Sequence, residues 1–150
     1  MKSEKFILHL QALLDKGFES INQISETTLS AKPSLNKWSK KEILGHLIDS
    51  GVNNLQRFTE IQFNNQPYNI RKYDQNELVK VNHYQTSDTQ EILNFWLAVN
   101  QRILFVMQQQ TETSLNYKVV LSDGKMVDLF FLMEDYVLHL EHHLNQIIAS

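Results

Sequence analysis

Three histidines of this 150-residue chain occur where a helical protein can bring them to one point. His139 and His143 lie four residues apart in the segment MEDYVLHLEHHLNQII, and His46 lies far upstream in WSKKEILGHLIDSGVNNLQRF. On an α-helix, residues i and i+4 project from the same side, one turn apart. Imidazole is the commonest protein ligand for zinc and similar ions. Two histidines on one turn and a third from a facing helix would leave a coordination position open, which is the form of a catalytic zinc site.

The spacing on the C-terminal helix leaves a second pairing open. His142 is about 100° around the helix from His143, and His139 and His142, three residues apart, can also share a face. A further alternative is a helix whose polar side happens to carry three histidines. His9 and His83 have no comparable partner, and we expect them to be surface or loop residues.

A polar strip accompanies His46 along its own segment. Asp49, Ser50 and Asn53 follow it at i+3, i+4 and i+7, and Glu42 precedes it at i−4. A polar strip that faces a bundle core is costly unless something satisfies it, so the strip predicts either a buried site or a solvent-exposed face. Asp49 is a candidate to orient a ligand histidine, to act as general base or to close the site as a fourth ligand. For Glu42, capping the helix is the better assignment.

Composition limits the chemistry. With 0 Cys, the chain has no disulfide, no iron–sulfur cluster, no thiolate zinc site and no cysteine nucleophile, so any metal must be held by histidines and carboxylates. A hydrophobic fraction of 42% is ordinary for a globular protein, and only 4 Gly and 2 Pro favour long helices over a turn-rich β protein. A net charge of −3, with no basic cluster longer than Lys40-Lys41, argues against nucleic-acid binding.

The N-terminal segment is not expected to be a signal peptide, because His9, Gln11 and Asp15 interrupt its apolar residues. No stretch approaches the roughly 18 apolar residues of a membrane span, so no membrane association is expected. We therefore expect a cytoplasmic protein that forms a single domain over residues 1–150.

Apolar residues at spacings of three and four predict four long amphipathic helices. They are expected over residues 3–29, 39–63, 88–108 and 128–148. Ser39 with Glu42 and Asp88 with Glu91 each have the spacing of a capping box, in which two side chains satisfy helix N-terminal N–H groups reciprocally. The sequence therefore fixes where the second and third helices begin.

The connections differ in length. Asn64-Asn65-Gln66-Pro67 is a turn signal, and residues 68–86 are predicted to form a long crossover loop with about one helical turn. Residues 116–126 predict a short β-hairpin with a type I′ turn at Asp123-Gly124. The predicted fold is all-α: a four-helix bundle with a long loop after the second helix, so that its topology need not be simple up-and-down.

The two histidine segments resemble the DinB-like superfamily of bacterial four-helix proteins, in order and spacing over almost the whole chain. The shared features are a Trp-Ser start, a Glu near the cap, a His followed by Leu and an acidic residue, and a downstream His-x-x-x-His followed by Gln-Ile. In that family these three histidines bind a divalent metal. The resemblance implies His46, His139 and His143 as the ligands, with His142 as an extra histidine that is not a ligand. All-imidazole ligation suits zinc or nickel.

The resemblance also implies a function. Members of the family include thiol-dependent S-transferases, a mycothiol-dependent isomerase and proteins described as metal-dependent hydrolases. We therefore expect a metal-dependent enzyme of thiol S-transferase or hydrolase type, acting on a small-molecule substrate with a low-molecular-weight thiol or water as nucleophile. The alternative is a non-catalytic metal-binding or structural bundle that works through protein association.

The third helix bears on that alternative. Phe95, Trp96 and Phe105 lie on different sides of it, which leaves aromatic surface for a possible homodimer. Phe95 and Val99 are expected in the core in preference to Phe105.

Overall fold

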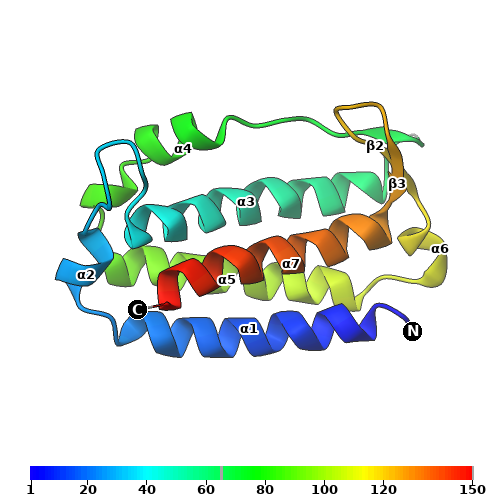
Figure 1. Ribbon diagram of the computed structural model, residues 1–150. Helices are drawn as coiled ribbons and strands as arrows, with labels where there is room; N and C mark the ends of the chain where they lie inside the picture. Colours follow the sequence, from blue (N-terminus) through cyan, green and yellow to red (C-terminus); the bar gives the residue numbers. More distant parts are fainter. Residues whose placement is uncertain (65, 150) are drawn as a thin grey trace.

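The chain has four long helices, and they run side by side along the molecule (Figure 1). The computed structural model describes residues 1–64 and 66–149. The long helices are α1 (Glu4–Asn22), α3 (Lys40–Ile61), α5 (Thr89–Gln108) and α7 (Leu129–Ile148). The predicted all-α four-helix bundle is confirmed.

Each long helix packs against two others. α3 and α1 both pack against α5 and α7. α1 and α7 run in one direction along the bundle, and α3 and α5 run in the opposite one (Figure 1). Because α3 and α5 are consecutive long helices with the same direction, the chain must return along the bundle between them. The predicted crossover is therefore present, and the topology is not simple up-and-down.

The crossover holds more structure than the single helical turn predicted for it. It contains β1 (Tyr68–Asn69), the two-turn helix α4 (Gln75–Val81) and the 3₁₀ turn η1 (Tyr84–Thr86). Asp74 caps α4 by accepting a hydrogen bond from the backbone N–H of Glu77 at 3.1 Å. Asn65, part of the turn predicted before this segment, lies outside the described residues.

A small sheet closes one end of the bundle. β2 (Lys118–Val120) and β3 (Met126–Asp128) form the predicted antiparallel hairpin, and β1 from the crossover adds to β2 in parallel. The short helix α6 (Glu112–Leu115) leads into it from α5. This pairing anchors the beginning of the crossover, just after α3, to the segment that precedes α7.

The type I′ turn predicted in this hairpin is wrong. That turn requires positive φ at both central residues, and of Asp123 and Gly124 only the glycine has it, at 87°. Gly124 donates its N–H to the carbonyl of Leu121 at 2.9 Å, and Leu121 donates to the carbonyl of Lys125 at 2.8 Å. The connection is therefore a three-residue loop, residues 122–124, that ends in the left-handed Gly124.

The prediction of one continuous helix over residues 3–29 is also wrong in one respect, because two separate helices occupy this segment. α1 ends at Asn22, and α2 (Glu26–Ser30) starts a new helix. The Ser25 hydroxyl accepts from the backbone N–H of Thr28 at 3.1 Å and so caps the second piece. Serine offers the backbone such a local alternative to a continuous helix.

Caps fix the beginnings of the other long helices. At α3, Glu42 N–H donates to Ser39 Oγ and Ser39 N–H donates to Glu42 Oε1, both at 3.1 Å, which confirms the predicted capping box. At α5, Asp88 accepts from Glu91 N–H at 3.0 Å, but the reciprocal bond of a box is not formed. At α7, Asp128 accepts from the N–H of Phe131 at 2.8 Å. α3 and α7, which carry the candidate histidines, therefore have defined starting points.

The apolar faces of the four helices meet in one core. Its fully buried side chains include Leu10, Leu14, Leu44, Ile48, Trp96, Ile103, Leu140 and Leu144. Val99 is buried as expected, but Phe95 is 45% exposed, so its predicted core position is wrong. Phe95 precedes the buried Trp96 by one residue and so points about 100° away from it. Among residues 1–64 and 66–149, none of the helices combines the length and the apolar character of a membrane span.

Candidate metal centre

The packing of α3 against α7 determines which histidines meet. The two helices run in opposite directions (Figure 1). His46 lies near the start of α3, and His139 and His143 lie in the second half of α7. Because the start of α3 faces the end of α7, these three side chains converge although the sequence separates them widely.

The three imidazoles form one cluster. His46 Nε2 lies 3.4 Å from His139 Nε2. The ring centroids of His46 and His143 are 4.8 Å apart, and those of His139 and His143 are 4.5 Å apart. One ring nitrogen from each residue lies within 4.8 Å of the other two. Among residues 1–64 and 66–149, this is the one group of His, Asp or Glu side chains with such a geometry.

The dimensions of the cluster fit a divalent metal. Zinc binds imidazole nitrogen at about 2.0–2.1 Å, and a tetrahedral angle then separates two such nitrogens by about 3.4 Å. The Nε2 atoms of His46 and His139 have that separation. The other ligand atoms lie no more than 4.8 Å apart, so ring shifts of about 1 Å would close the site.

Burial keeps two histidines of the cluster in the neutral form that a metal requires. His46 is only 1% exposed. Its burial, reinforced by the neighbouring His143 and His139, lowers its pKa to about 4. Burial likewise lowers the pKa of His139 to about 4, with His143 and His142 adding to the effect. Because metal ligation needs deprotonated imidazole, neither residue would have to lose a proton at neutral pH.

Two neighbours orient the rings. The indole of Trp38 stacks on His46, with ring centroids 5.0 Å apart and planes inclined by 30°. His143 Nδ1 lies 2.9 Å from Gln146 Oε1. A carbonyl oxygen can only accept, so this contact assigns the proton to Nδ1 and leaves Nε2 free to bind a metal. His46 Nδ1 is buried and has no hydrogen-bond partner.

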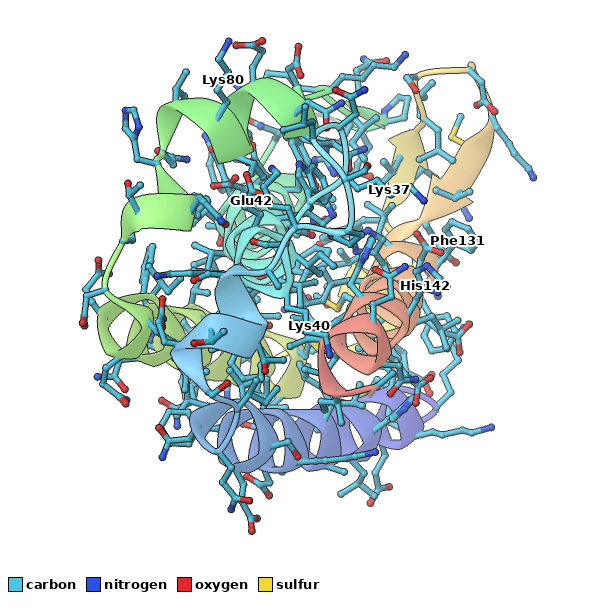
Figure 2. The ribbon with its side chains drawn as sticks, turned by 60° about the vertical axis from the view of Figure 1, so that its left-hand side comes forward. Lys37, Lys40, Glu42, Lys80, Phe131 and His142 are labelled. Atoms are coloured by element: carbon cyan, nitrogen blue, oxygen red, sulfur yellow. The ribbon has the colours of Figure 1, made fainter. Side chains whose placement is uncertain are left out.

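His142 stays outside the cluster. It is solvent-exposed, and its Nε2 lies 3.4 Å from Gln146 Nε2. Figure 2 shows it at the outer side of α7. The structure thus brings together the i, i+4 pair of α7 and not the i, i+3 pair. Metal binding by the three clustered histidines remains a prediction.

Asp49 is buried, 5% exposed, and turned toward the crossover. Its Oδ1 accepts from the hydroxyl of Tyr84 at 2.7 Å and from Asn82 Nδ2 at 3.0 Å, while its Oδ2 is buried without a partner. Burial raises the pKa of the Asp49 carboxyl, and the two hydrogen bonds act in the opposite direction. Sequence reasoning missed Tyr84 and Asn82, because both lie in the segment interpreted as a loop.

The remaining polar candidates are accounted for by the fold. Glu42 belongs to the cap of α3 and also accepts from Lys32 Nζ at 2.8 Å. His9, expected at the surface, is partly exposed and lies 2.9 Å from Glu141 Oε2, which links α1 to α7. His83 is exposed and occupies the left-handed region at φ 54°, just before η1.

A cavity of about 210 Å³ includes His139 in its wall. Its other polar wall residues are Ser50, Asn54, Arg57, Tyr73, Asp135 and Tyr136. A larger hollow of about 390 Å³ lies on the other side of Trp38, between the segment before α3 and the α4–η1 region, and the three clustered histidines do not line it. Of these two hollows, the cavity at His139 is the one lined by a histidine of the cluster.

Comparison with known proteins agrees with this architecture. Residues 9–147 match the family described as the DinB superfamily. No curated protein matches the sequence significantly. Among solved structures, the fold is similar to YfiT from Bacillus subtilis, described as a probable metal-dependent hydrolase with an unusual four-helix bundle topology. That similarity has a TM-score of 0.86 and 21% identity, and it covers 97% of this chain and 83% of YfiT.

A second similar structure is a mycothiol-dependent maleylpyruvate isomerase, with a TM-score of 0.71 and 10% identity. The similarity covers 99% of this chain and 66% of the isomerase chain, so this protein spans about two thirds of that enzyme's length. At sequence identities this low, the two similarities show a shared fold alone.

Proposed function

This chain belongs to the DinB superfamily, and on that premise we propose that it is a metal-dependent enzyme of thiol S-transferase or hydrolase type. The proposed site holds one divalent ion through His46, His139 and His143. The observation that carries the proposal is the convergence of three imidazoles, one buried and two partly exposed, beside a cavity. Zinc or nickel suits such a ligand set.

Three protein ligands leave a position for a nucleophile. When bound, a divalent ion lowers the pKa of a coordinated water or thiol, so that a nucleophile is available at neutral pH. In thiol transfer, the thiol sulfur forms a bond to an electrophilic carbon, and the leaving group departs with the electron pair of the broken bond and takes up a proton. In hydrolysis, water takes the place of the thiol.

The chain's own residues supply positioning. Trp38 holds the ring of His46, and Gln146 holds that of His143. We propose Asp49 as the general base. Its support is a carboxyl whose pKa is raised by burial and whose Oδ2 is without a partner. Tyr84 and Asn82 occupy the other oxygen, so Oδ2 is the atom that would take up the proton.

A nucleophilic thiol would have to come from another molecule, because the chain contains 0 Cys. The similarity in fold to a mycothiol-dependent enzyme supports a low-molecular-weight thiol as that partner. The second substrate would be a small electrophile that fits a cavity of about 210 Å³.

The proposal is tested with untagged, zinc-loaded protein. Cysteine, glutathione and coenzyme A would each be assayed with 1-chloro-2,4-dinitrobenzene for thiol transfer, and p-nitrophenyl acetate would be assayed for hydrolysis. We expect at least one rate above background that disappears in the metal-free protein and in His139→Ala. Equal rates with and without metal would contradict the proposal.

A non-catalytic bundle that works through association is the second candidate. The observation that favours it is the exposed aromatic surface of α5, where Phe95 is 45% and Phe105 is 50% exposed. A homodimer through this surface would appear in sedimentation velocity as a species of twice the chain mass, and Phe105→Ser would dissociate it.

A further inference from the structure

Arg57 lies in the same cavity wall as His139. It belongs to α3 and follows His46 by eleven residues, which is three helical turns, so both residues project from nearly the same side. α7 runs antiparallel to α3 along this side (Figure 1). The cavity therefore has the histidine cluster toward one end of α3 and the guanidinium toward the other.

The guanidinium of Arg57 is held in place but not neutralised. Nη1 donates to Asn54 Oδ1 at 3.5 Å, Nη2 donates to the backbone carbonyl of Arg71, and the ring of Tyr73 lies 5.2 Å from the guanidinium carbon. These contacts use two of the five N–H donors of an arginine. In residues 1–64 and 66–149, no carboxylate forms an ion pair with Arg57.

Asp135 lines the same cavity without pairing with Arg57, and its side chain is solvent-exposed. Burial lowers the pKa of Arg57; the neighbouring Tyr73 and Tyr68 act in the opposite direction, and the positive charge of Arg71 lowers the pKa further. A half-buried cation without a counter-charge is costly. Asn54, Arg71 and Tyr73 fix its orientation without removing that cost, so an anion is the missing component of the cavity.

The geometry of the cation indicates which anion. Guanidinium presents a planar fork of donors that matches a carboxylate in two parallel hydrogen bonds. Part of the wall is apolar, formed by Ile70, Leu121, Phe131 and Leu132. The volume of about 210 Å³ is that of about seven water molecules. A small carboxylic acid with a short apolar body fits both the charge and the walls.

We propose that the cavity binds the carboxylate of a small substrate at Arg57, with the substrate's other end directed toward the histidine cluster. The assignment of the cluster as the reacting end rests on the proposed function. The carboxylate contact at Arg57 does not, because it needs no metal. Arg57 is thus a binding and specificity residue that selects anionic substrates over neutral ones of the same shape.

The test uses the full chain without metal, with hexanoate and its neutral isostere hexanamide as probes. Binding is followed by the NMR signal of the Arg57 Nε–H group and by calorimetry. We expect hexanoate to shift that signal saturably and hexanamide to bind at least tenfold more weakly. Arg57→Gln should weaken hexanoate at least tenfold and leave hexanamide unchanged.

Arg71→Gln is the matched control, because it removes the same charge from a neighbouring exposed side chain that does not line the cavity. It should change hexanoate affinity by less than twofold. If Arg57→Gln does not fold, Arg57→Lys replaces it, and the loss of the planar fork should weaken hexanoate at least threefold. Hexanoate affinity that is unchanged in the folded Arg57 variant, or no hexanoate binding to the parent, would overturn the proposal.

Zinc content separates this proposal from the proposed function. Arg57→Gln should take up as much zinc as the parent. A parent protein that binds hexanoate through Arg57 but takes up no zinc would refute the metal-dependent function and leave the carboxylate site standing. A parent protein that binds zinc but not hexanoate would refute the carboxylate site and leave the metal-dependent function standing.

Discussion

His46 Nε2 lies 3.4 Å from His139 Nε2, across an interface between two helices whose residues are 93 positions apart in the chain. At most one of these nitrogens can carry the proton of a hydrogen bond between them, and the nearby His143 adds a third nitrogen. A divalent cation satisfies all three lone pairs at once. This contact is the basis of the predictions that follow.

Metal removal should weaken the fold without abolishing it. The bundle has a full apolar core apart from the histidines, so the metal-free protein should keep its helical circular dichroism at 25 °C. A ligand at a hundredfold excess over its Kd contributes about 2.7 kcal/mol. For a chain of 150 residues, this corresponds to a melting temperature about 5–10 °C lower after chelation. Complete unfolding by the chelator would identify a structural metal and count against catalysis.

The metal-free protein should lose stability in acid through its histidines. In the folded state the pKa values of His46 and His139 are about 4, below their ordinary value of 6.5. The fold therefore prefers neutral imidazole. The stabilisation that neutral imidazole gives the folded state is fully present above pH 6.5. It is lost as the pH falls toward 4, by an amount on the order of 2 kcal/mol for the buried His46.

Thermal melts of the metal-free parent and of His46→Gln between pH 7 and 4 measure this effect. Carboxylates titrate in both proteins, so the comparison depends on the difference between them. We expect the variant to lose less stability than the parent over this range. Parallel curves would show that protonation of His46 is not linked to folding.

Gly45 should not tolerate a methyl group. A Cβ atom there would lie 2.1 Å from Cδ2 and 2.2 Å from Cγ of Tyr84, whose hydroxyl holds Asp49. Gly45→Ala should cost about 2 kcal/mol or more in denaturant unfolding, although alanine is the better helix former.

Gly51→Ala on the same helix is the matched control. Its nearest neighbour would be Val99 Cγ1 at 3.1 Å, so it should change the free energy of unfolding by less than about 1 kcal/mol. A Gly45→Ala variant as stable as Gly51→Ala would mean that Tyr84 does not pack against α3 in this way.

The cobalt-loaded protein should bind an external ligand. With three histidine ligands and a tetrahedral preference, one position stays open, so azide should change the visible spectrum. Asp49→Asn should respond as the parent does, because Tyr84 and Asn82 hold the Asp49 carboxyl on the crossover side. A spectrum unmoved by azide and by thiols would indicate a closed site and would favour the non-catalytic alternative.

Much of this architecture was predictable because it is encoded locally. The helical spacing of apolar residues gave four long helices, and the Ser39–Glu42 cap fixed the start of α3. The direction of α3 and α7 then sufficed to bring His46 to His139 and His143. The break before α2 escaped prediction, since the apolar period continues to Leu29 and only the Ser25 cap interrupts it.

Features that depend on contacts between distant segments were not predictable in this way. The spacing of Asp49 from His46 predicts a site residue. The partners of Asp49 come from a polar segment without clear periodicity, so they could not be predicted. In that segment, Tyr84 packs against Gly45. The pairing of β1 with β2 joins residues about 50 positions apart. Arg57 reads as an ordinary helix residue until the fold puts it in one cavity with His139.

Zinc stoichiometry is the most direct test of the three-histidine site. Untagged protein would be dialysed to equilibrium against buffered zinc and analysed alongside His46→Ala, His139→Ala, His143→Ala and the matched control His142→Ala. We predict one zinc per chain in the parent and in His142→Ala, and severe loss of affinity in each of the other three variants. Zinc retained by His143→Ala but lost by His142→Ala would contradict the site described for α7, and zinc retained by all four variants would refute the metal centre itself.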